Sequence, residues 1–173
     1  MLWGTGIYTS REQGTLRGEL SERLEDPRPR PGIVLPGQAY AILKVPSIGV
    51  DEVVGQGTGT EALKRGPGHY DETDDPWEDE GRVGIAGHRT TYGAPFWDLD
   101  QVRRGDVITL ITEFGTYAYR VTRSEVIPPT RIGVLDPTKG PTLVLTTCTP
   151  RFSAAQRLIV FASLIPGRGD APA

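Results

Sequence analysis

The sequence predicts an all-β fold, an antiparallel barrel or sandwich, on two observations. From Gln38 onward, short runs rich in β-branched and aromatic residues alternate with glycine, proline and aspartate. Helical periodicity is scarce over the same part of the chain. The 173 residues suit one globular domain, which at this size needs no disulfides to be stable.

Seven runs of mainly apolar residues, each bounded by turn residues, predict the strands. These are residues 40–45, 50–54, 82–86, 106–112, 116–127, 142–147 and 158–164. We expect short helical turns at residues 60–64 and, directly after Pro95, at residues 96–102.

The amino-terminal part predicts a separate extension. Leu16, Leu20 and Leu24 lie on one face of residues 10–24, which indicates an amphipathic helix. Four prolines then favour an extended linker up to residue 37. We therefore expect three parts: an N-terminal helix and proline-rich linker (1–37), a compact β domain (38–166) and a flexible tail (167–173).

Charge and cysteine content exclude several function classes. The net charge of −3 gives no basic domain for nucleic-acid binding. Cys148 is the single cysteine, so the chain has no internal disulfide and no multi-thiolate metal site. No apolar stretch approaches the roughly 20 residues of a membrane-spanning helix. Near the start, Trp3 and Tyr8 suit either a membrane–water interface or packing on the domain.

Residues 71–80 hold seven of the 22 acidic side chains and no basic one. Clustered carboxylates suit a hard cation such as calcium, but their spacing is unlike that of an EF-hand. A solvated acidic loop is the simpler interpretation. We therefore predict no cofactor and no metal ligands, with calcium at this loop as the alternative.

Three residue types suited to thiol acyl transfer lie at predicted strand ends. Cys148 follows the strand 142–147, His88 follows the strand 82–86, and Arg157 lies nine residues after Cys148. A thiolate is a nucleophile, an imidazole transfers protons, and a guanidinium stabilises developing negative charge. Taken singly, they also fit a core thiol, a loop histidine and a surface cation.

The pattern around these residues resembles the sortases, the bacterial cysteine transpeptidases. It consists of TLVLTTCTP, the arginine nine residues after the cysteine, and GIAGHR sixty residues before it. The segments GHRTTYGAPFWDLD and WGTGIYTSREQ are further similar to class E sortases of high-GC Gram-positive bacteria. The resemblance implies a closed eight-stranded β-barrel with short helices. Its eighth strand would lie near His69 and Tyr70, and we assign His69 to structure.

The resemblance also implies residue roles. Cys148 would be the nucleophile, His88 the general acid/base, and Arg157 the oxyanion or substrate-positioning residue. Thr147 would touch the sorting peptide or shape the pocket, and Tyr92 matches a class E feature associated with substrate selection. An ordinary strand threonine and an exposed loop tyrosine remain the alternatives for these two.

The implied reaction is cleavage of an LPXTG-like sorting signal, LAXTG for class E, between Thr and Gly. A thioester at Cys148 would pass the surface protein to an amine of a peptidoglycan precursor. The groove would be walled by residues 124–141 and 149–156. The implied location is the extracytoplasmic face of the cell membrane, held by an N-terminal anchor that would precede the WGTGIYT segment.

Two alternatives differ from this reaction. The first is another thiol acyl-transferase, of L,D-transpeptidase or papain type. Both fit poorly, because His88 lies sixty residues before Cys148, whereas the first type has its histidine close before the cysteine and the second has its cysteine before the histidine. The second is a sortase-like barrel without activity that binds peptides or takes part in a pilus.

Overall fold

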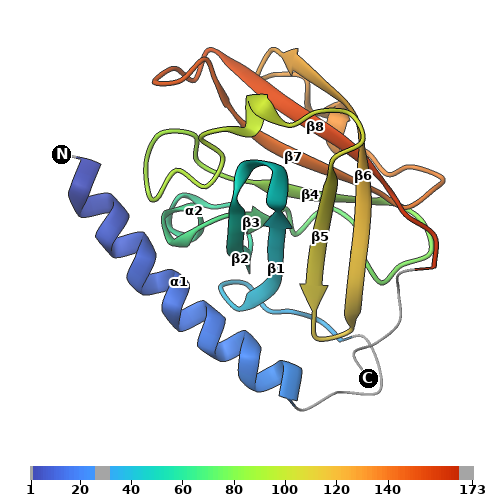
Figure 1. Cartoon of the computed structure of the whole chain (residues 1–173), viewed down its shortest axis with the longest axis horizontal. Helices are drawn as coiled ribbons and strands as arrows, with labels where there is room; N and C mark the ends of the chain where they lie inside the picture. The colour runs from blue at the N-terminus through green and yellow to red at the C-terminus, as the bar shows by residue number, and fades with distance from the viewer. Residues whose placement is uncertain (1, 26–31, 168–173) are drawn as a thin grey trace.

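The computed structural model describes residues 2–25 and 32–167 (Figure 1). Half of the predicted linker, residues 26–31, and the predicted tail from residue 168 onward lie outside the described residues. The side chain of Trp3 lies outside them as well.

Within the described ranges, eight strands close into one barrel in the order β1-β2-β3-β4-β7-β8-β6-β5. The strands are β1 (Ala39–Val45), β2 (Val50–Gln56), β3 (Gly68–His69), β4 (Arg82–Ala86), β5 (Val107–Thr112), β6 (Gly115–Ile127), β7 (Thr142–Thr149) and β8 (Gln156–Leu164). All seven predicted strands are confirmed. The short β3 is the eighth strand that the family resemblance implied.

The barrel is mixed, so the prediction of a purely antiparallel sheet is wrong for two strand pairs. β2 pairs in parallel with β3, and β4 pairs in parallel with β7. Parallel neighbours need a crossover connection. The helix α2 (Thr60–Arg65) lies within the first crossover, and strands β5 and β6 lie within the second.

Alternate side chains of β7 and β8 fill the barrel interior. Leu143 and Leu145 of β7 are buried there together with Val160 of β8. The outer face of the same strands carries a smaller apolar cluster, which includes Val144 and Ile159. Because side chains alternate along a strand, the outer face continues toward the end of β7 that holds Cys148.

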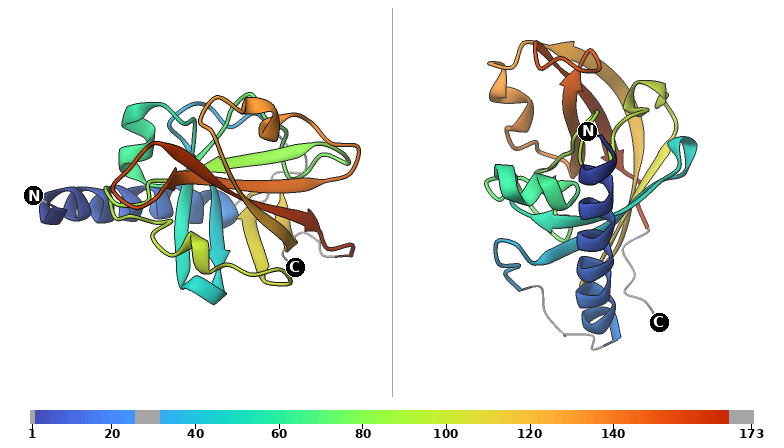
Figure 2. Two further views of the ribbon diagram at one scale, coloured as in Figure 1. Left: turned by 90° about the horizontal axis from the view of Figure 1, so that it is seen from above. Right: turned by 90° about the vertical axis from the view of Figure 1, so that its left-hand side faces the viewer.

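The N-terminal helix α1 (Leu2–Glu25) is longer than predicted and lies beside β1, β2 and α2 (Figures 1 and 2). Leu16 and Leu20 are each 1% exposed, and they pack against Ala39 and Val53. The amino-terminal end of α1 projects beyond the barrel (Figure 2). Tyr8 of this helix is 43% exposed. No helix among the described residues is long and apolar enough to cross a membrane.

The short helical elements are partly as predicted. The turn expected at residues 60–64 is α2, and the turn expected at 96–102 is the 3-10 helix η2 (Leu99–Gln101). Two more 3-10 helices, η1 (Pro46–Ile48) and η3 (Ile132–Leu135), were not predicted. A single turn has too few residues to produce a periodic pattern in the sequence.

The middle of the acidic segment, residues 71–80, is attached to the barrel. The Tyr40 hydroxyl donates to the Asp75 carboxylate at 2.5 Å, and the Asp74 carboxylate accepts from the Arg82 backbone N–H at 2.7 Å. The acidic residues on either side of this pair are exposed. No cluster of three or more His, Cys, Asp or Glu side chains within the described part of the chain suits a metal ion.

Candidate active site

Cys148 and Arg157 are direct partners in the β7–β8 register. Residues opposite each other in an antiparallel pair present their side chains on the same face. Cys148 and Arg157 therefore present their side chains on one face of the sheet, although the two residues line different pockets. Cys148 is partly exposed, because β7 ends one residue later.

His88 lies at the same end of the barrel. β4 pairs in parallel with β7 up to Ala86 and Thr146, and the Gly87 backbone N–H then donates to the Thr146 carbonyl at 3.1 Å. The chain thus carries His88 alongside the end of β7. His88 and Cys148 line one pocket of about 340 Å³.

Gly87 makes this placement sterically feasible. A Cβ atom at Gly87 would lie 2.6 Å from the ring of Phe96, which is fully buried. Any larger residue would push the Phe96 ring or the His88 backbone out of place. Glycine before His88 is therefore required by packing.

Burial lowers the pKa of His88 below its ordinary value. The imidazole is consequently neutral at neutral pH and able to accept a proton. Its ring centroid lies 5.2 Å from that of Tyr92, at an interplanar angle of 39°. Tyr92 has a left-handed backbone (φ 51°), and its ring also lies 5.9 Å from the Lys64 ammonium.

Arg157 lines a neighbouring pocket. Its Nη1 donates to the backbone carbonyls of Ala154 (2.9 Å) and Gln156 (3.1 Å). This second pocket, of about 80 Å³, is mainly apolar. Its walls are Tyr70, Ile127, Pro128, Pro129, Arg131, Ile132, Val134, Leu135, Thr146, Arg157 and Ile159. Arg157 therefore stands between the Cys148 pocket and a groove formed by the connection from β6 to β7.

Thr147 does not reach the pocket of Cys148. Its side chain is 3% exposed and lies on the barrel-interior face, and its hydroxyl donates to the Gly87 carbonyl at 2.7 Å. Of the two roles expected for Thr147, direct contact with a peptide is inconsistent with this position. Shaping the pocket through Gly87 is consistent with it.

His69 is buried among structural contacts. Its ring stacks on Tyr40, with the centroids 4.1 Å apart. Its ring nitrogens lie 2.8 Å from the Gln56 side-chain oxygen and 3.1 Å from the Asp74 carbonyl. Burial lowers the pKa of His69 to about 4, despite the hydrogen bond to Asp74. The structural assignment of His69 fits these contacts.

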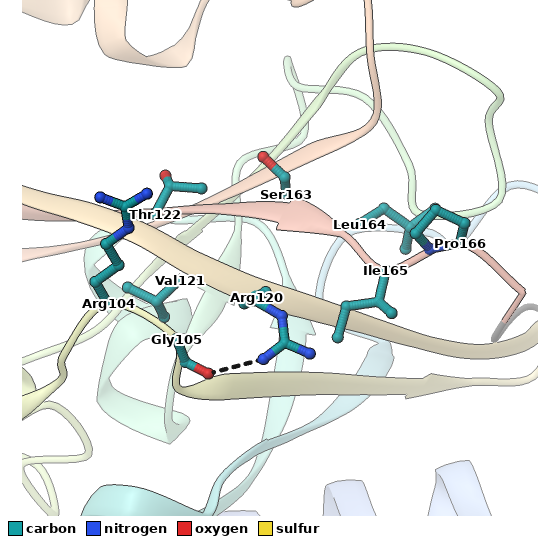
Figure 3. A pocket seen from close by; sticks show the side chains of 9 residues that line it. All are labelled: Arg104, Gly105, Arg120, Val121, Thr122, Ser163, Leu164, Ile165 and Pro166. Carbon is teal, nitrogen blue, oxygen red and sulfur yellow. Dashed lines mark hydrogen bonds between the residues drawn. The ribbon is translucent and has the colours of Figure 1, made fainter.

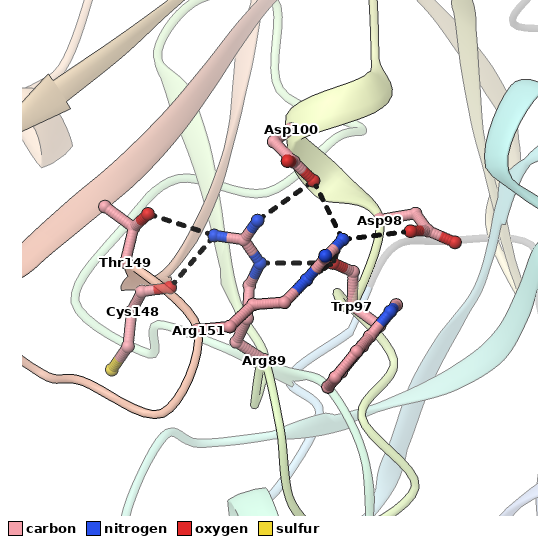
Figure 4. A network of polar contacts seen from close by, with 7 residues as sticks. All are labelled: Arg89, Trp97, Asp98, Asp100, Cys148, Thr149 and Arg151. Carbon is pink, nitrogen blue, oxygen red and sulfur yellow. Dashed lines mark hydrogen bonds and ion pairs between the residues drawn. The ribbon is translucent and has the colours of Figure 1, made fainter.

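Sequence reasoning missed Arg89, which is 5% exposed and directly follows His88. Its guanidinium contacts residues of two other segments, around Asp100 and Thr149 (Figure 4). No periodicity connects these positions, so the only signal in the sequence is the adjacency to His88.

Another open pocket, of about 340 Å³, lies between β6 and β8 (Figure 3). Arg104 and Arg120 contribute its cationic groups, and Arg120 donates to the Gly105 carbonyl at 3.2 Å. Its lining contains no cysteine, histidine or carboxylate, so it offers no nucleophile and no general base.

Comparisons with known protein families and curated proteins point in one direction. The sortase domain family model matches residues 43–165. Sortase SrtE1 of Streptomyces coelicolor is 32% identical over 184 aligned positions, which cover 96% of this chain and 52% of that protein. Sortase D of Bacillus subtilis is 30% identical, covering 75% of this chain and 65% of that protein. The chain thus spans about half to two thirds of the length of these relatives.

Solved structures extend the similarity to the fold. A Clostridium perfringens Sortase D5 transpeptidase has a TM-score of 0.81 at 28% identity, covering 90% of this chain and 99% of that one. Sortase E1 from Streptomyces coelicolor, with a tripeptide in its active site, has a TM-score of 0.73 at 32% identity, covering 79% and 94%. Sortase E from Streptomyces avermitilis has a TM-score of 0.69 at 37% identity, covering 76% and 90%.

Proposed function

Because this chain belongs to the sortase family, we propose that it is a cysteine transpeptidase with Cys148 as its nucleophile. The observation that carries the proposal is the position of Cys148. It shares a pocket with His88 and is paired in register with Arg157. These three side chains cover nucleophilic attack, proton transfer and charge stabilisation, so the reaction needs no cofactor.

In the first half of the reaction, the Cys148 sulfur attacks the carbonyl carbon of the scissile peptide bond. The thiol proton passes to the neutral His88 imidazole, which then donates it to the leaving amine. The C–N bond breaks and a thioester remains on Cys148. In the second half, an incoming amine attacks the thioester and loses its proton to His88, which returns it to the departing thiolate.

Arg157 stabilises the oxyanion that develops in both halves. Its guanidinium carries a permanent positive charge and is bound to the Ala154 and Gln156 carbonyls, at the residue that pairs with Cys148 in the β7–β8 register. Donors placed where negative charge appears in the transition state contribute more than groups that bind the ground state.

The proposed substrate is an LPXTG-like sorting signal, LAXTG in class E, cleaved between Thr and Gly. The apolar groove beside Arg157, with Ile127, Ile132 and Leu135 in its walls, suits the short aliphatic side chains of such a peptide. A tripeptide occupies the active site of the related Sortase E1 from Streptomyces coelicolor. Tyr92, in ring contact with His88, would contribute to substrate selection, and Thr147 would shape the pocket through Gly87.

The proposed partners are surface proteins with a C-terminal sorting signal and an amine of a peptidoglycan precursor. We place the enzyme at the extracytoplasmic face of the cell membrane, where both partners meet, with an N-terminal anchor holding the protein there. Calcium at residues 71–80 has no part in the reaction. Adding calcium is therefore expected to leave turnover and melting temperature unchanged.

The experiment is turnover of a fluorogenic LAXTG peptide with and without an amine acceptor. The wild type is expected to cleave between Thr and Gly and to form the amine adduct. Cys148→Ala should form neither product, and Arg157→Ala should be slower by about 100-fold or more. Full activity in Cys148→Ala would refute the proposed nucleophile. Peptide binding without turnover by the wild type would instead identify a peptide-binding module.

A further inference from the structure

We propose that Arg89 is a positioning residue that holds His88 and Cys148 in the relative position that the reaction requires. The inference rests on the proposed function, because it concerns the same two reacting groups. Its basis is one buried guanidinium that joins the segment of His88 to the end of the strand that carries Cys148 (Figure 4).

All three nitrogens of the Arg89 guanidinium make polar contacts. Its Nε donates to the Trp97 carbonyl at 3.1 Å, and its Nη1 donates to the Thr149 hydroxyl at 3.1 Å and to the Cys148 carbonyl at 3.4 Å. Its Nη2 lies 2.9 Å from the Asp100 carboxylate. A planar fork with donors in three directions is a property of arginine that lysine lacks.

These contacts join three segments that are far apart in the sequence. Arg89 directly follows His88, Cys148 and Thr149 end β7, and Trp97 lies in the segment that leads into η2. The backbone next to His88 is also held from the barrel interior, by the Thr147 hydroxyl on the Gly87 carbonyl. The Arg89 side chain is therefore a second hydrogen-bonded connection to this backbone, after the Thr147 hydroxyl. It also donates to the backbone carbonyl of Cys148.

Asp100 makes the buried cation tolerable. The Arg89 side chain is 5% exposed, whereas Asp100 is 40% exposed at the rim. A guanidinium buried to this degree without an anion would be strongly destabilising. Arg151, from the loop after β7, binds the same Trp97 carbonyl (3.1 Å) and the same Asp100 carboxylate (3.5 Å). Arg89, next to His88, and Arg151, in the loop after Cys148, are therefore bound to the same two acceptors, the Trp97 carbonyl and the Asp100 carboxylate.

The position of Arg89 predicts which kinetic constant it controls. Arg89 lines the pocket of His88 and Cys148, but not the apolar groove beside Arg157. Its loss would misplace the reacting groups without removing a contact from that groove. Since a misplacement of about 1 Å can lower a rate about 100-fold, the effect belongs in kcat and not in KM.

The test compares Arg89→Met and Arg89→Lys with Arg65→Met as a matched control. Arg65 also pairs with a carboxylate, Glu12 at 2.8 Å, and a backbone carbonyl, Gly37 at 2.8 Å, but it joins α1 and α2. Both Arg89 variants should lose about 10- to 100-fold in kcat with KM unchanged. Arg65→Met should lower the melting temperature and leave kcat unchanged.

Asp100→Asn serves as a further variant in case Arg89→Met does not fold. It removes the anion at a partly exposed site, keeps the guanidinium, and should lower kcat in the same direction by a smaller factor. Wild-type kcat in every folded variant of Arg89 and Asp100 would overturn the inference.

A readout without substrate separates this inference from the proposed function. Iodoacetamide alkylates Cys148 directly, and its rate at pH 7 depends on the groups held near the thiol. Arg89→Met should react several-fold more slowly than the wild type, and Arg65→Met should react at the wild-type rate. If the wild type turns over no peptide, the proposed function fails, and the alkylation rates alone then test the role of Arg89. Equal rates in that case would overturn the role of Arg89.

Discussion

The Thr147 hydroxyl donates a 2.7 Å hydrogen bond to the Gly87 carbonyl across the parallel strands β4 and β7. The residue before the candidate nucleophile, Cys148, is thereby bonded to the residue before the candidate base, His88. The bond is buried, so it is not exchanged for a bond to water. Through this bond, the interior side chain of Thr147 is connected to the residue that precedes His88, and His88 lines the pocket on the other face of the strand.

Thr147→Val should destabilise the protein by about 1–3 kcal/mol, because it leaves the buried Gly87 carbonyl without its donor. Urea unfolding measures this change. Thr147→Ser keeps the hydroxyl and is the control, with a smaller loss. In peptide turnover, Thr147→Val should lower kcat and leave KM unchanged. A raised KM with unchanged kcat would show that Thr147 contacts the peptide after all.

Leu20→Ala should lower the free energy of unfolding by about 2–5 kcal/mol, because Leu20 is 1% exposed between α1 and the barrel. Ile7→Ala on the same helix is the matched control. Ile7 is 70% exposed, so its truncation should change stability by less than about 0.5 kcal/mol. Equal losses in the two variants would mean that α1 does not pack on the barrel as described.

His69 should make stability depend on pH. Burial holds its folded-state pKa near 4, whereas the unfolded chain has the ordinary value near 6.5. Between these values the unfolded state binds more protons, so stability is present above about pH 6.5 and is lost as the pH falls toward 4. The loss reaches about 3 kcal/mol. The measurement is urea unfolding from pH 4 to 8, with His69→Gln as the comparison. Parallel pH curves for the two proteins would contradict the prediction.

Arg157→Lys should retain the positive charge and still lose about 100-fold in kcat. Arg157 donates from one end of its planar guanidinium fork, Nη1, to the Ala154 and Gln156 carbonyls, and it pairs with Cys148 in the β7–β8 register. A lysine ammonium is a point charge without that fixed fork. Steady-state peptide turnover gives kcat for Arg157→Lys and the wild type. Wild-type kcat in the lysine variant would mean that charge alone is sufficient.

The strands were predictable from sequence because each is a short apolar run with clear turn residues at its ends. The boundaries of β4 matched the prediction, and β7 continued two residues further to include Cys148. The parallel pairs of β2 with β3 and of β4 with β7 were not predictable from residue patterns. Local patterns report which residues form a strand, but not which distant strand lies beside it.

The candidate site likewise contains some residues that the sequence predicts and others that it does not. Cys148, His88 and Arg157 stood at predicted strand ends, where a motif can be seen in the sequence. The side-chain direction of Thr147 depends on the register of β7, which the sequence motif does not encode. Arg89 gave no pattern at all, because its partners Asp100 and Thr149 meet it only in the folded barrel.

The proposed function requires Cys148 to carry an acyl group during turnover. Its most direct test is the intact mass of the protein after incubation with an LAXTG peptide in the absence of an amine acceptor. We predict one adduct, whose added mass is that of the peptide fragment ending in threonine, less one water, joined to the protein through the threonine carbonyl. The adduct should be located at Cys148, absent from Cys148→Ala and released by hydroxylamine. Cleavage between Thr and Gly without any adduct at Cys148 would contradict the claim.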